Sequence, residues 1–235
     1  MRVAVVMPVL NEAGAIGPTV RGVIGLVDDV IVVDGNSRDA TVAEARAAGA
    51  EVLVETRRGY GQACASGARL AAGRGADLLV FMDGDGADVP EAMASLVSPI
   101  RDGSADFVIA SRTRGRREPG SMAWHQVLAG QVIGAGIGLA TGVRYSDMCA
   151  FRAIRPQTLA DLDMREMGYG WNLEMQMRAA QVRLRIREIP VPYRCRVAGA
   201  SKVSGNLRGT LHAGSRIMAT LVRLTAETWR MPRPG

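Results

Sequence analysis

The sequence has little cysteine, few aromatic residues and almost no lysine. Its 235 residues include three cysteines, 4% aromatic residues and, among 29 basic residues, the single lysine Lys202. Cys64, Cys149 and Cys195 are too few, too far apart and odd in number for a disulfide framework or a CxxC metal site. We therefore expect three small buried thiols in a reducing, cytoplasmic compartment. Because aromatic side chains are not interleaved with the arginines, a nucleic-acid-binding module is not expected.

Long hydrophobic runs are also missing. The longest weakly polar stretch covers residues 127–143, and Gln131 and five glycines interrupt it. It is shorter than the roughly 20 residues that a membrane span needs, so no transmembrane segment is predicted. The apolar run at the N-terminus ends at Asn11 and Glu12, where a signal peptide would instead have its cleavage region.

The remaining composition is that of a globular protein with an uneven charge distribution. Hydrophobic residues make up 48% and charged residues 22% of the chain, and the net charge is +6. Residues 1–110 carry 9 basic and 15 acidic residues, whereas residues 111–235 carry 20 basic and 8 acidic residues. An acidic half joined to a basic half indicates that a cation is bound in the first half and an anion in the second.

The first half alternates between apolar runs and helical segments. Runs rich in Val, Ile and Leu are predicted to be buried strands at residues 2–9, 30–34, 51–55, 77–83 and 106–111. Helices are predicted between them at residues 13–27, 39–48 and 61–72, and another from Pro90. Repeated units of this kind predict an α/β fold with a mostly parallel sheet, helices on both faces and ligands beyond the carboxyl ends of the strands.

The second half loses this rhythm. Residues 112–120 form a basic loop in this interpretation. Helices are predicted at 121–142, 171–181 and 206–228, strands at 148–154 and 183–191, and a loop at 193–205. No internal repeat or low-complexity linker divides the chain. We therefore expect one continuous domain over residues 1–235, with a nucleotide-binding half at 1–110 and an acceptor half at 111–235.

The strongest local feature is an acidic segment that follows a predicted strand. Asp83, Asp85 and Asp88 lie within six residues, separated by glycine and alanine. Neighbouring carboxylates repel one another, and proteins tolerate this mostly where a cation or hydrogen-bond donors neutralise them. Mg²⁺ or Mn²⁺, held by one or two carboxylates and a substrate phosphate, fits this pattern. The alternative is a solvated acidic turn that caps the helix at Pro90.

Polar residues also follow the first two strands. Asn11 and Glu12 end the first apolar run, where Asn11 could cap the next helix or contact a ligand. Asp34 ends the second run, where a carboxylate is well placed to accept hydrogen bonds from a ribose or a base. A parallel sheet brings such strand ends to one edge, which makes the combination stronger than either segment alone.

These segments together resemble a known family. The motifs are PVLNE at 8–12, VDGNS at 33–37, GYG at 59–61, DGD at 83–85, SD at 146–147, AFRAI at 150–154, GYGWNLEM at 168–175 and RVAGASK at 196–202. In order and spacing they are similar to glycosyltransferase family 2, with its inverting members and GT-A fold. The second half resembles the dolichyl-phosphate mannose synthase and polyprenyl-phosphate glycosyltransferase branch. The similarity covers about residues 3–220.

The resemblance implies a role for particular residues. A UDP- or GDP-linked sugar would be bound by Pro8, Asn11, Glu12, Asp34, Gly61, Asp83, Arg196, Ser201 and Lys202. Asp83 and Asp85 would hold Mg²⁺ or Mn²⁺ at the diphosphate, with Asp85 counted among the catalytic residues. Arg196, Ser201 and Lys202 would lie on a loop that closes over the phosphates. Arg112, together with His125 and Gln126 after Trp124, would contact a polyprenyl phosphate acceptor.

The sequence leaves open one other acceptor, a hydroxyl group, and one other activity, that of a nucleotidyltransferase. A hydroxyl acceptor needs a carboxylate to remove its proton, whereas a phosphate oxygen is already anionic, and Asp147 and Glu174 are the candidate catalytic bases. A nucleotidyltransferase would carry a glycine-rich phosphate loop after the first strand, where the segment from Pro8 to Glu12 stands instead.

The last predicted helix is amphipathic. Leu207, Leu211, Met218, Leu221, Val222 and Thr225 recur at helical spacing, and Arg208, His212, Arg216, Arg223 and Arg230 lie largely on another side. This pattern is consistent with peripheral contact at the inner face of the membrane. It is equally consistent with packing on the domain or on a second subunit of a homo-oligomer.

Overall fold

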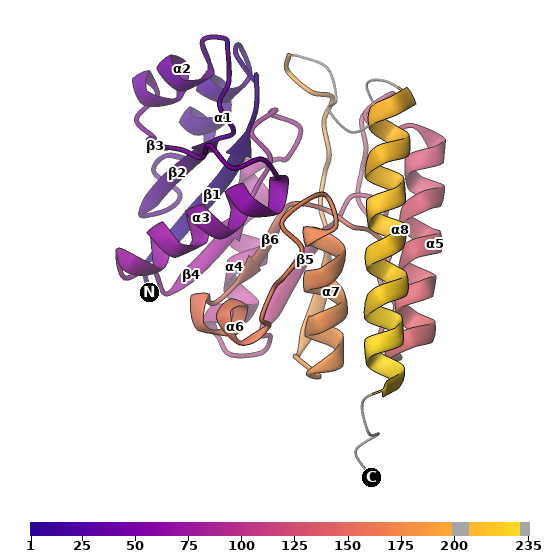
Figure 1. Cartoon of the computed structure of the whole chain (residues 1–235). Helices are drawn as coiled ribbons and strands as arrows, with labels where there is room; N and C mark the ends of the chain where they lie inside the picture. Colours follow the sequence, from indigo (N-terminus) through magenta and orange to yellow (C-terminus); the bar gives the residue numbers. More distant parts are fainter. Residues whose placement is uncertain (199–206, 231–235) are drawn as a thin grey trace.

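The computed structural model describes residues 1–198 and 207–230, with the side chains of 207–213 and of residue 230 left out of the description. In these residues seven strands form one sheet in the order β3-β2-β1-β4-β6-β5-β7 (Figure 1). The strands are β1 (Val3–Val9), β2 (Asp29–Asp34), β3 (Glu51–Val54), β4 (Leu78–Phe81), β5 (Phe107–Ser111), β6 (Arg152–Ile154) and β7 (Ile186–Pro190). Only β6 is antiparallel to its neighbours, β4 and β5. The predicted α/β fold with a mostly parallel sheet is confirmed.

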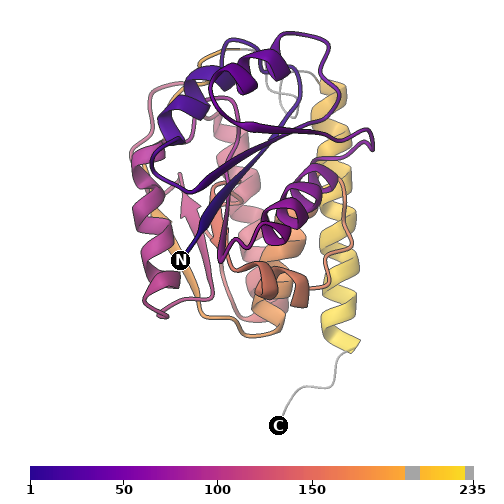
Figure 2. The ribbon, with the colours of Figure 1, turned by 90° about the vertical axis from the view of Figure 1, so that its left-hand side faces the viewer.

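Helices cover both faces of this sheet. They are α1 (Ile16–Val23), α2 (Thr41–Ala47), α3 (Tyr60–Gly73), α4 (Met93–Arg101), α5 (Trp124–Thr141), α6 (Pro156–Asp161), α7 (Trp171–Gln181) and α8 (Leu207–Arg230), with a short 3-10 turn η1 (Pro90–Ala92) before α4. Helix α3 packs on β1 and β2, and α4 packs on β5 and β6 on the opposite face (Figure 2). Helix α8 lies against both α5 and α7 at one end of the sheet (Figure 1).

Small residues allow α3 to approach the sheet closely. A Cβ atom added at Gly67 would lie 2.4 Å from Val6 Cγ1 and 2.8 Å from Val33 Cγ2. Glycine at this position therefore brings the helix backbone nearer to β1 and β2 than any larger residue would permit. The same helix contributes the buried thiol of Cys64 to the core. Because α3 is held this close, the loops at the carboxyl edge of β1 and β2 are built on a rigid base.

Several predicted boundaries differ from the structure. The helix predicted at 13–27 is shortened to α1, and Gly14 and Gly25, both with positive φ, lie just outside its ends. Helix α5 begins at Trp124 and is closed by Gly142 in the left-handed conformation, close to the predicted range. The strand predicted at 183–191 starts only at Ile186, because Arg183 has φ 57°.

Three further expectations need correction. The strand predicted at 148–154 is reduced to β6, and α6 was not predicted at all. Cys64 and Cys149 are buried free thiols as expected, but Cys195 is exposed, so the expectation of a buried thiol is wrong there. Its segment lies over the carboxyl edge of the sheet rather than in the core, and its N–H donates to Glu118 at 2.7 Å.

Candidate active site

The loops after β1 and β2 are bonded to each other at the carboxyl edge of the sheet. The N–H of Asn11 donates to Ser37 Oγ at 2.7 Å, and Asn11 Oδ1 accepts the N–H of Arg38 at 2.9 Å. The carboxylate of Asp34 is buried and accepts both the N–H and the hydroxyl of Ser37. Asn11 is thus a bridge between the loops, and the alternative that it caps α1 is wrong, since Ala15 is at the N-cap.

The acidic segment after β4 folds into a tight turn. Asp88 is buried and its Oδ2 accepts the N–H of Asp83 at 3.1 Å, whereas Asp85 Oδ1 accepts the N–H of Ala87 at 2.9 Å. Gly86, with φ 79°, permits the reversal. Asp88 therefore shapes the turn from inside, and the interpretation as a merely solvated acidic turn is wrong, because Asp85 and Asp88 are each 3% exposed.

Burial and neighbouring negative charge destabilise the charged forms of Asp83 and Asp88. Burial, followed by the charge of Asp85, raises the pKa of Asp83 to about 7. Burial, followed by the charges of Asp83 and Asp85, raises the pKa of Asp88 well above its usual range. The positive charges of Arg112 and Arg196 oppose the shift at Asp83. Because negative charge is unfavourable at these buried positions, the cluster favours binding of additional positive charge.

Arg196 supplies part of that charge. Its Nη1 lies 2.7 Å from Asp85 Oδ2 and its Nη2 lies 2.8 Å from Glu12 Oε1. The N–H of Val197 donates to the carbonyl oxygen of Asp85 at 3.0 Å, so backbone and side chain hold this segment on the acidic turn. The structure thus brings together three residues that are far apart in the sequence, Glu12, Asp85 and Arg196. Ser201 and Lys202 lie outside the described residues.

Arg112, which is partly buried, and Asp147, which is buried, form an ion pair beside the acidic turn. Arg112 Nη2 donates to Asp147 Oδ1 at 2.8 Å, and both its Nε and its backbone N–H donate to Asp147 Oδ2 at 2.9 Å. Burial by itself would raise the pKa of Asp147, but the hydrogen bonds and charge of Arg112 lower it below its usual value. The guanidinium also lies 5.0 Å from the ring centre of Tyr193. Asp147 therefore holds Arg112 in one orientation.

Glu174 occupies a different part of the molecule. It is fully buried and accepts the N–H groups of Arg165 and Glu166, and it pairs with Arg178 at 3.0 Å and Arg223 at 3.3 Å. These contacts offset its burial and lower its pKa. Within the described residues, none of its hydrogen bonds or ion pairs reaches the acidic turn. Glu174 joins α7 to α8.

Four other predicted site residues have structural contacts. Pro8 lies in β1 opposite Val33 of β2. Gly61 is the second residue of α3, its N–H donates to the carbonyl oxygen of Gly168 at 3.2 Å, and it leaves no room for a Cβ atom. Gln126 Oε1 accepts the N–H of Ala123 at 2.8 Å and so caps α5, and His125 is exposed beside the ring of Trp124. Their roles in binding stay predictions.

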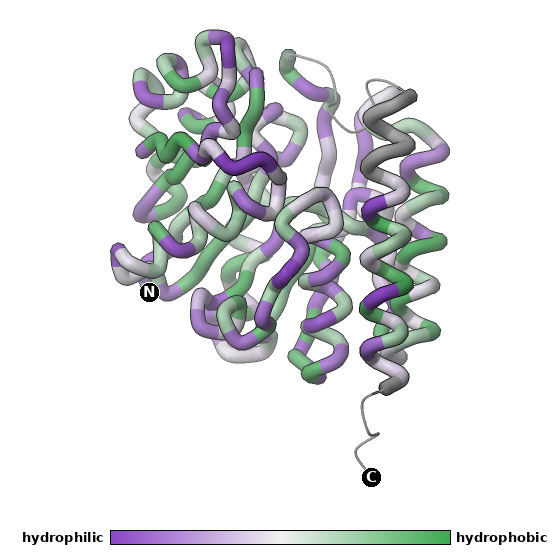
Figure 3. Tube along the Cα trace, in the orientation of Figure 1, coloured by the Kyte–Doolittle hydropathy of each residue, from purple (hydrophilic) through white to green (hydrophobic). Residues whose placement is uncertain are grey.

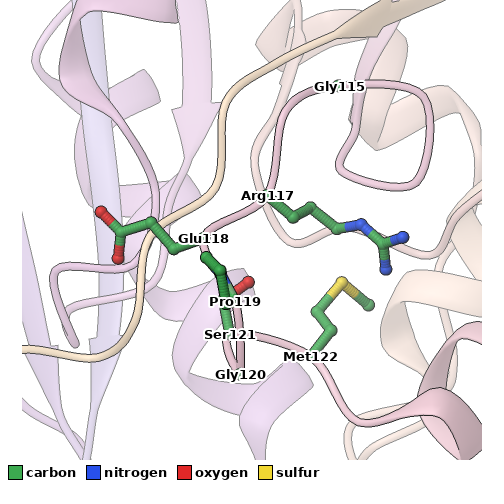
Figure 4. Close-up of a pocket in the computed structure, with 7 residues that line it drawn as sticks. All are labelled: Gly115, Arg117, Glu118, Pro119, Gly120, Ser121 and Met122. Carbon is green, nitrogen blue, oxygen red and sulfur yellow. The ribbon is translucent and has the colours of Figure 1, made fainter.

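The basic loop after β5 curls around a small cavity (Figure 4). Its volume is about 360 Å³, and its lining is Gly115, Arg117, Glu118, Pro119, Gly120, Ser121 and Met122. Figure 4 shows Arg117 and Met122 extending to the same side, away from Glu118. The loop is held in place at Gly115, where a Cβ atom would lie 1.8 Å from the carbonyl oxygen of Val191. A cation and a thioether therefore lie together in the loop that follows Arg112.

Arg152 and Tyr193 are site features that the sequence reasoning missed. Arg152 is fully buried in β6 opposite Phe81, and its guanidinium donates to the carbonyl oxygens of Cys149, Ala150 and Asn172. Burial lowers its pKa. A lone arginine in an otherwise apolar run was the available signal for Arg152. Tyr193 had no such signal, because its stacking under Arg112 depends on tertiary structure.

Comparison with known proteins identifies the family. A family model described as glycosyl transferase family 2 matches residues 4–157, which is more than half of the chain. The chain belongs to glycosyltransferase family 2. The resemblance inferred from the motifs and the prediction of a glycosyltransferase are confirmed.

Relatives of this family 2 glycosyltransferase cover nearly its whole length. It is 37% identical over 218 residues to an uncharacterised glycosyltransferase of Mycobacterium tuberculosis, with 90% of this chain and 94% of the relative covered. It is 35% identical over 225 residues to an undecaprenyl-phosphate mannosyltransferase of Micrococcus luteus, with 89% and 90% covered. It is 32% identical over 234 residues to a dolichyl-phosphate hexose transferase of Haloferax volcanii, with 95% and 94% covered.

Solved structures confirm the GT-A fold of the glycosyltransferase. Glucosyl-3-phosphoglycerate synthase from Mycobacterium tuberculosis, in complex with Mn²⁺, uridine diphosphate and glucosyl-3-phosphoglycerate, superposes with a TM-score of 0.75 at 22% identity. The match covers 100% of this chain and 82% of that one. In the part of the chain that the structure describes, no group of three or more His, Cys, Asp or Glu side chains is arranged to hold a metal ion by itself. No helix there is both long and apolar enough to cross a membrane.

Proposed function

We propose that this glycosyltransferase transfers a hexose from a UDP- or GDP-linked sugar to a polyprenyl phosphate, with inversion at the anomeric carbon. The named activities of the relatives from Micrococcus luteus and Haloferax volcanii support this acceptor class. The observation that carries the proposal is that Asp147 and Glu174, the two candidate bases for a hydroxyl acceptor, are both engaged elsewhere. Each accepts several hydrogen bonds and has a lowered pKa.

The donor is proposed to bind at the carboxyl edge of β1, β2 and β4. Pro8 near the end of β1, Asp34 at the end of β2 and Asn11 in the loop after β1 would contact the base and ribose, in the half of the chain formed by residues 1–110. The bonds between these loops support the assignment, because they fix Asn11 and Asp34 before a ligand arrives. Gly61, Ser201 and Lys202 are included from the family resemblance.

Asp83 and Asp85 fit a divalent cation. Mg²⁺ and Mn²⁺ take oxygen ligands and commonly use one or two carboxylates together with substrate phosphates. The carboxylate of Asp83 accepts no hydrogen bond from the described residues, and burial, followed by the charge of Asp85, raises its pKa to about 7. A bound cation would supply Lewis-acid neutralisation of the leaving diphosphate. Arg196 would then exchange part of its pairing with Asp85 for the phosphates.

The acceptor phosphate is proposed to bind Arg112. Asp147 occupies Nε and Nη2 of Arg112 and leaves the third guanidinium nitrogen without a hydrogen bond to a described residue. A phosphate oxygen is anionic at neutral pH and attacks without a base, forming the new C1–O bond as the bond to the nucleoside diphosphate breaks. A single displacement of this kind inverts the configuration. His125 and Gln126 remain acceptor candidates by resemblance.

The enzyme is proposed to work at the cytoplasmic side of the membrane. Cys64, Cys149 and Cys195 are all free, which suits a reducing compartment. A polyprenyl chain stays in the bilayer, so the acceptor would be reached from the membrane surface. A homo-oligomer stays a prediction from the amphipathic last helix.

The proposal is tested with purified enzyme, Mn²⁺ and a panel of UDP- and GDP-sugars. Release of nucleoside diphosphate is measured with a short-chain polyprenyl phosphate, with 3-phosphoglycerate or with buffer alone. We expect acceptor-dependent turnover only with the polyprenyl phosphate, and a product whose anomeric proton coupling shows inversion. Turnover with 3-phosphoglycerate and none with the lipid phosphate would establish a hydroxyl acceptor instead.

A further inference from the structure

Helix α5 exposes an apolar stripe although it lies on the surface. Trp124, Leu128, Val132 and Leu139 are between 51% and 88% exposed, and their spacing of four, four and seven residues places them on one side of the helix. The 18 residues of α5 include no Asp, Glu, Lys or Arg. A surface helix ordinarily presents charged side chains to water, so this stripe indicates contact with something other than water.

Helix α8 exposes a second stripe. Met218, Val222 and Trp229 are between 48% and 74% exposed, whereas Leu224 and Thr220 are buried against the domain. The apolar residues predicted on the last helix therefore divide into two groups, because Leu224 faces inward and Met218, Val222 and Trp229 face outward. Packing on the domain accounts for only the first group.

The two stripes form one continuous surface. Gly136 of α5 faces α8, since a Cβ atom there would lie 3.3 Å from Leu221 Cδ2. Both helices run away from the carboxyl edge of the sheet (Figure 1), and Figure 3 shows hydrophobic segments along both. At about 100° per residue, each stripe lies roughly 80° from this contact and on the side away from the sheet. We call this surface, formed by Trp124, Leu128, Val132, Leu139, Met218, Val222 and Trp229, the α5/α8 apolar face.

The charge around the α5/α8 apolar face is positive. Exposed arginines lie at both ends of α5, namely Arg116, Arg117 and Arg144, whereas Arg114 and Arg216 pair with Glu188 and Glu166, each at 3.8 Å. Glu118, the one acidic residue among residues 112–121, offsets one of these positive charges, and Glu227 of α8 pairs with Arg223. An apolar face bordered by arginines matches an anionic lipid surface. In a dimer through the same face, the arginines of two copies would repel each other.

We infer that the α5/α8 apolar face docks this enzyme on the surface of a bilayer that contains anionic lipids. Trp124 and Trp229, near the two ends of the face, are suited to the headgroup region, where tryptophan is enriched. The loop that follows Arg112 leads directly into α5, so a docked enzyme holds its acceptor loop at the lipid headgroups. The inference rests on the proposed function, because only a lipid-linked acceptor requires the enzyme to reach a membrane.

Intrinsic tryptophan fluorescence reports this docking directly. Two of the three tryptophans, Trp124 and Trp229, lie on the face, and the third, Trp171, is 2% exposed. Vesicles of phosphatidylcholine with 30 mol% phosphatidylglycerol are expected to shift the emission to shorter wavelength, and brominated lipid is expected to quench it. Pure phosphatidylcholine vesicles should give a smaller effect, and added salt should reduce binding to the anionic vesicles.

A double variant tests whether the face itself is responsible. V132Q/V222Q removes two exposed apolar side chains and is expected to lower the vesicle partition coefficient about tenfold or more. The matched control L26Q/V54Q changes two side chains of similar exposure, 54% and 44%, far from α5 and α8, and should bind vesicles like the wild type. Circular dichroism confirms that each variant is folded. Equal loss of binding in both double variants would overturn the assignment of the face.

Light scattering and a transfer assay separate the other outcomes. A wild-type dimer that V132Q/V222Q converts to monomers, without any vesicle-induced emission shift, would overturn the inference and identify a subunit interface. V132Q/V222Q should retain wild-type transfer to a short polyprenyl phosphate in detergent-free solution while losing transfer to a long-chain acceptor in vesicles. If the wild type binds vesicles but transfers sugar to no polyprenyl phosphate, the proposed function fails while the docking surface stands.

Discussion

Asp147 offers the sharpest test of how the acceptor is activated. Its two oxygens accept four hydrogen bonds, from the N–H groups of Arg112 and Met148 and from Nε and Nη2 of Arg112. In Asp147→Asn one oxygen becomes an NH₂ group, so two of these donors face another donor and the charge is lost. Hydrogen bonds to a charged partner contribute about 1.5–3 kcal/mol each, so we expect the free energy of unfolding to fall by about 3–5 kcal/mol.

The kinetic consequence distinguishes a positioning residue from a base. If Asp147 only orients Arg112, Asp147→Asn should raise the KM for the lipid phosphate about tenfold or more and change kcat by less than tenfold. A general base contributes about 10²–10⁴-fold to the rate. Steady-state assays below the melting temperature of the variant measure both constants. A loss of about 10³ in kcat with an unchanged acceptor KM would refute the positioning role.

Glu174 provides the matched control for this experiment. Glu174→Gln also weakens a buried, multiply bonded carboxylate, but its contacts join α7 to α8 and do not include Arg112. We therefore expect a loss of stability with little change in the acceptor KM. The pH profile adds an independent readout, since the acid limb should follow the second pKa of the phosphate monoester, about 6, in both variants and in the wild type.

Three further predictions concern the acidic turn, α5 and the end of β3. Asp85→Asn should reduce turnover by about 10² or more and raise the Mn²⁺ concentration needed for half-maximal rate, because one anionic ligand is lost. Gly134→Ala should destabilise strongly, since its Cβ atom would lie 1.9 Å from a backbone carbonyl oxygen, whereas Gly130→Ala, with nothing within 4 Å, should stabilise by about 0.5–1 kcal/mol. Hydrogen bonds, foremost those from Arg57, lower the pKa of the Glu55 carboxyl group. Glu55 therefore contributes fully to stability above the unfolded-state pKa of about 4.3, and this contribution declines as the pH falls below that value. Glu55→Gln should therefore be less stable than the wild type at pH 7, and the difference should narrow as the pH falls from 5 to 3.

Each of these predictions has a clear contrary result. Unchanged Mn²⁺ dependence in Asp85→Asn would remove Asp85 from the metal site. Thermal melts that rank Gly134→Ala level with Gly130→Ala would show that α5 does not pack as described. A stability difference between Glu55→Gln and the wild type that is constant from pH 7 to pH 3 in urea unfolding would mean that Glu55 keeps an ordinary pKa.

Much of the fold follows from short-range patterns in the sequence. The continuous Val, Ile and Leu runs of β1, β2 and β4 identify buried parallel strands, and the Asp83 to Asp88 spacing identifies the acidic turn. The antiparallel strand β6 has only three residues, and its direction depends on pairing with β4 and β5. Such long-range pairing leaves no local pattern in the sequence. For this reason the sequence predicts a longer strand, over residues 148–154.

The site was predictable in its residues but not in its pairings. The motifs indicated Glu12, Asp85 and Arg196 separately, but only the folded chain places one guanidinium between the two carboxylates. The sequence likewise left Asp147 open as a base, because a carboxylate beside a strand has the same pattern whether it is paired or not. Its partner Arg112 is 35 residues away, and tertiary contacts decide its protonation.

A competition between two acceptors tests the central claim most directly. Equal concentrations of a short-chain polyprenyl phosphate and the corresponding polyprenol are incubated with enzyme, Mn²⁺ and the preferred nucleotide sugar, and the products are separated and identified by mass spectrometry. The account predicts a single product in which the sugar is linked through phosphate, with nucleoside diphosphate released in equal amount. A product in which the sugar is attached to the alcohol, formed at a comparable or higher rate, would contradict it.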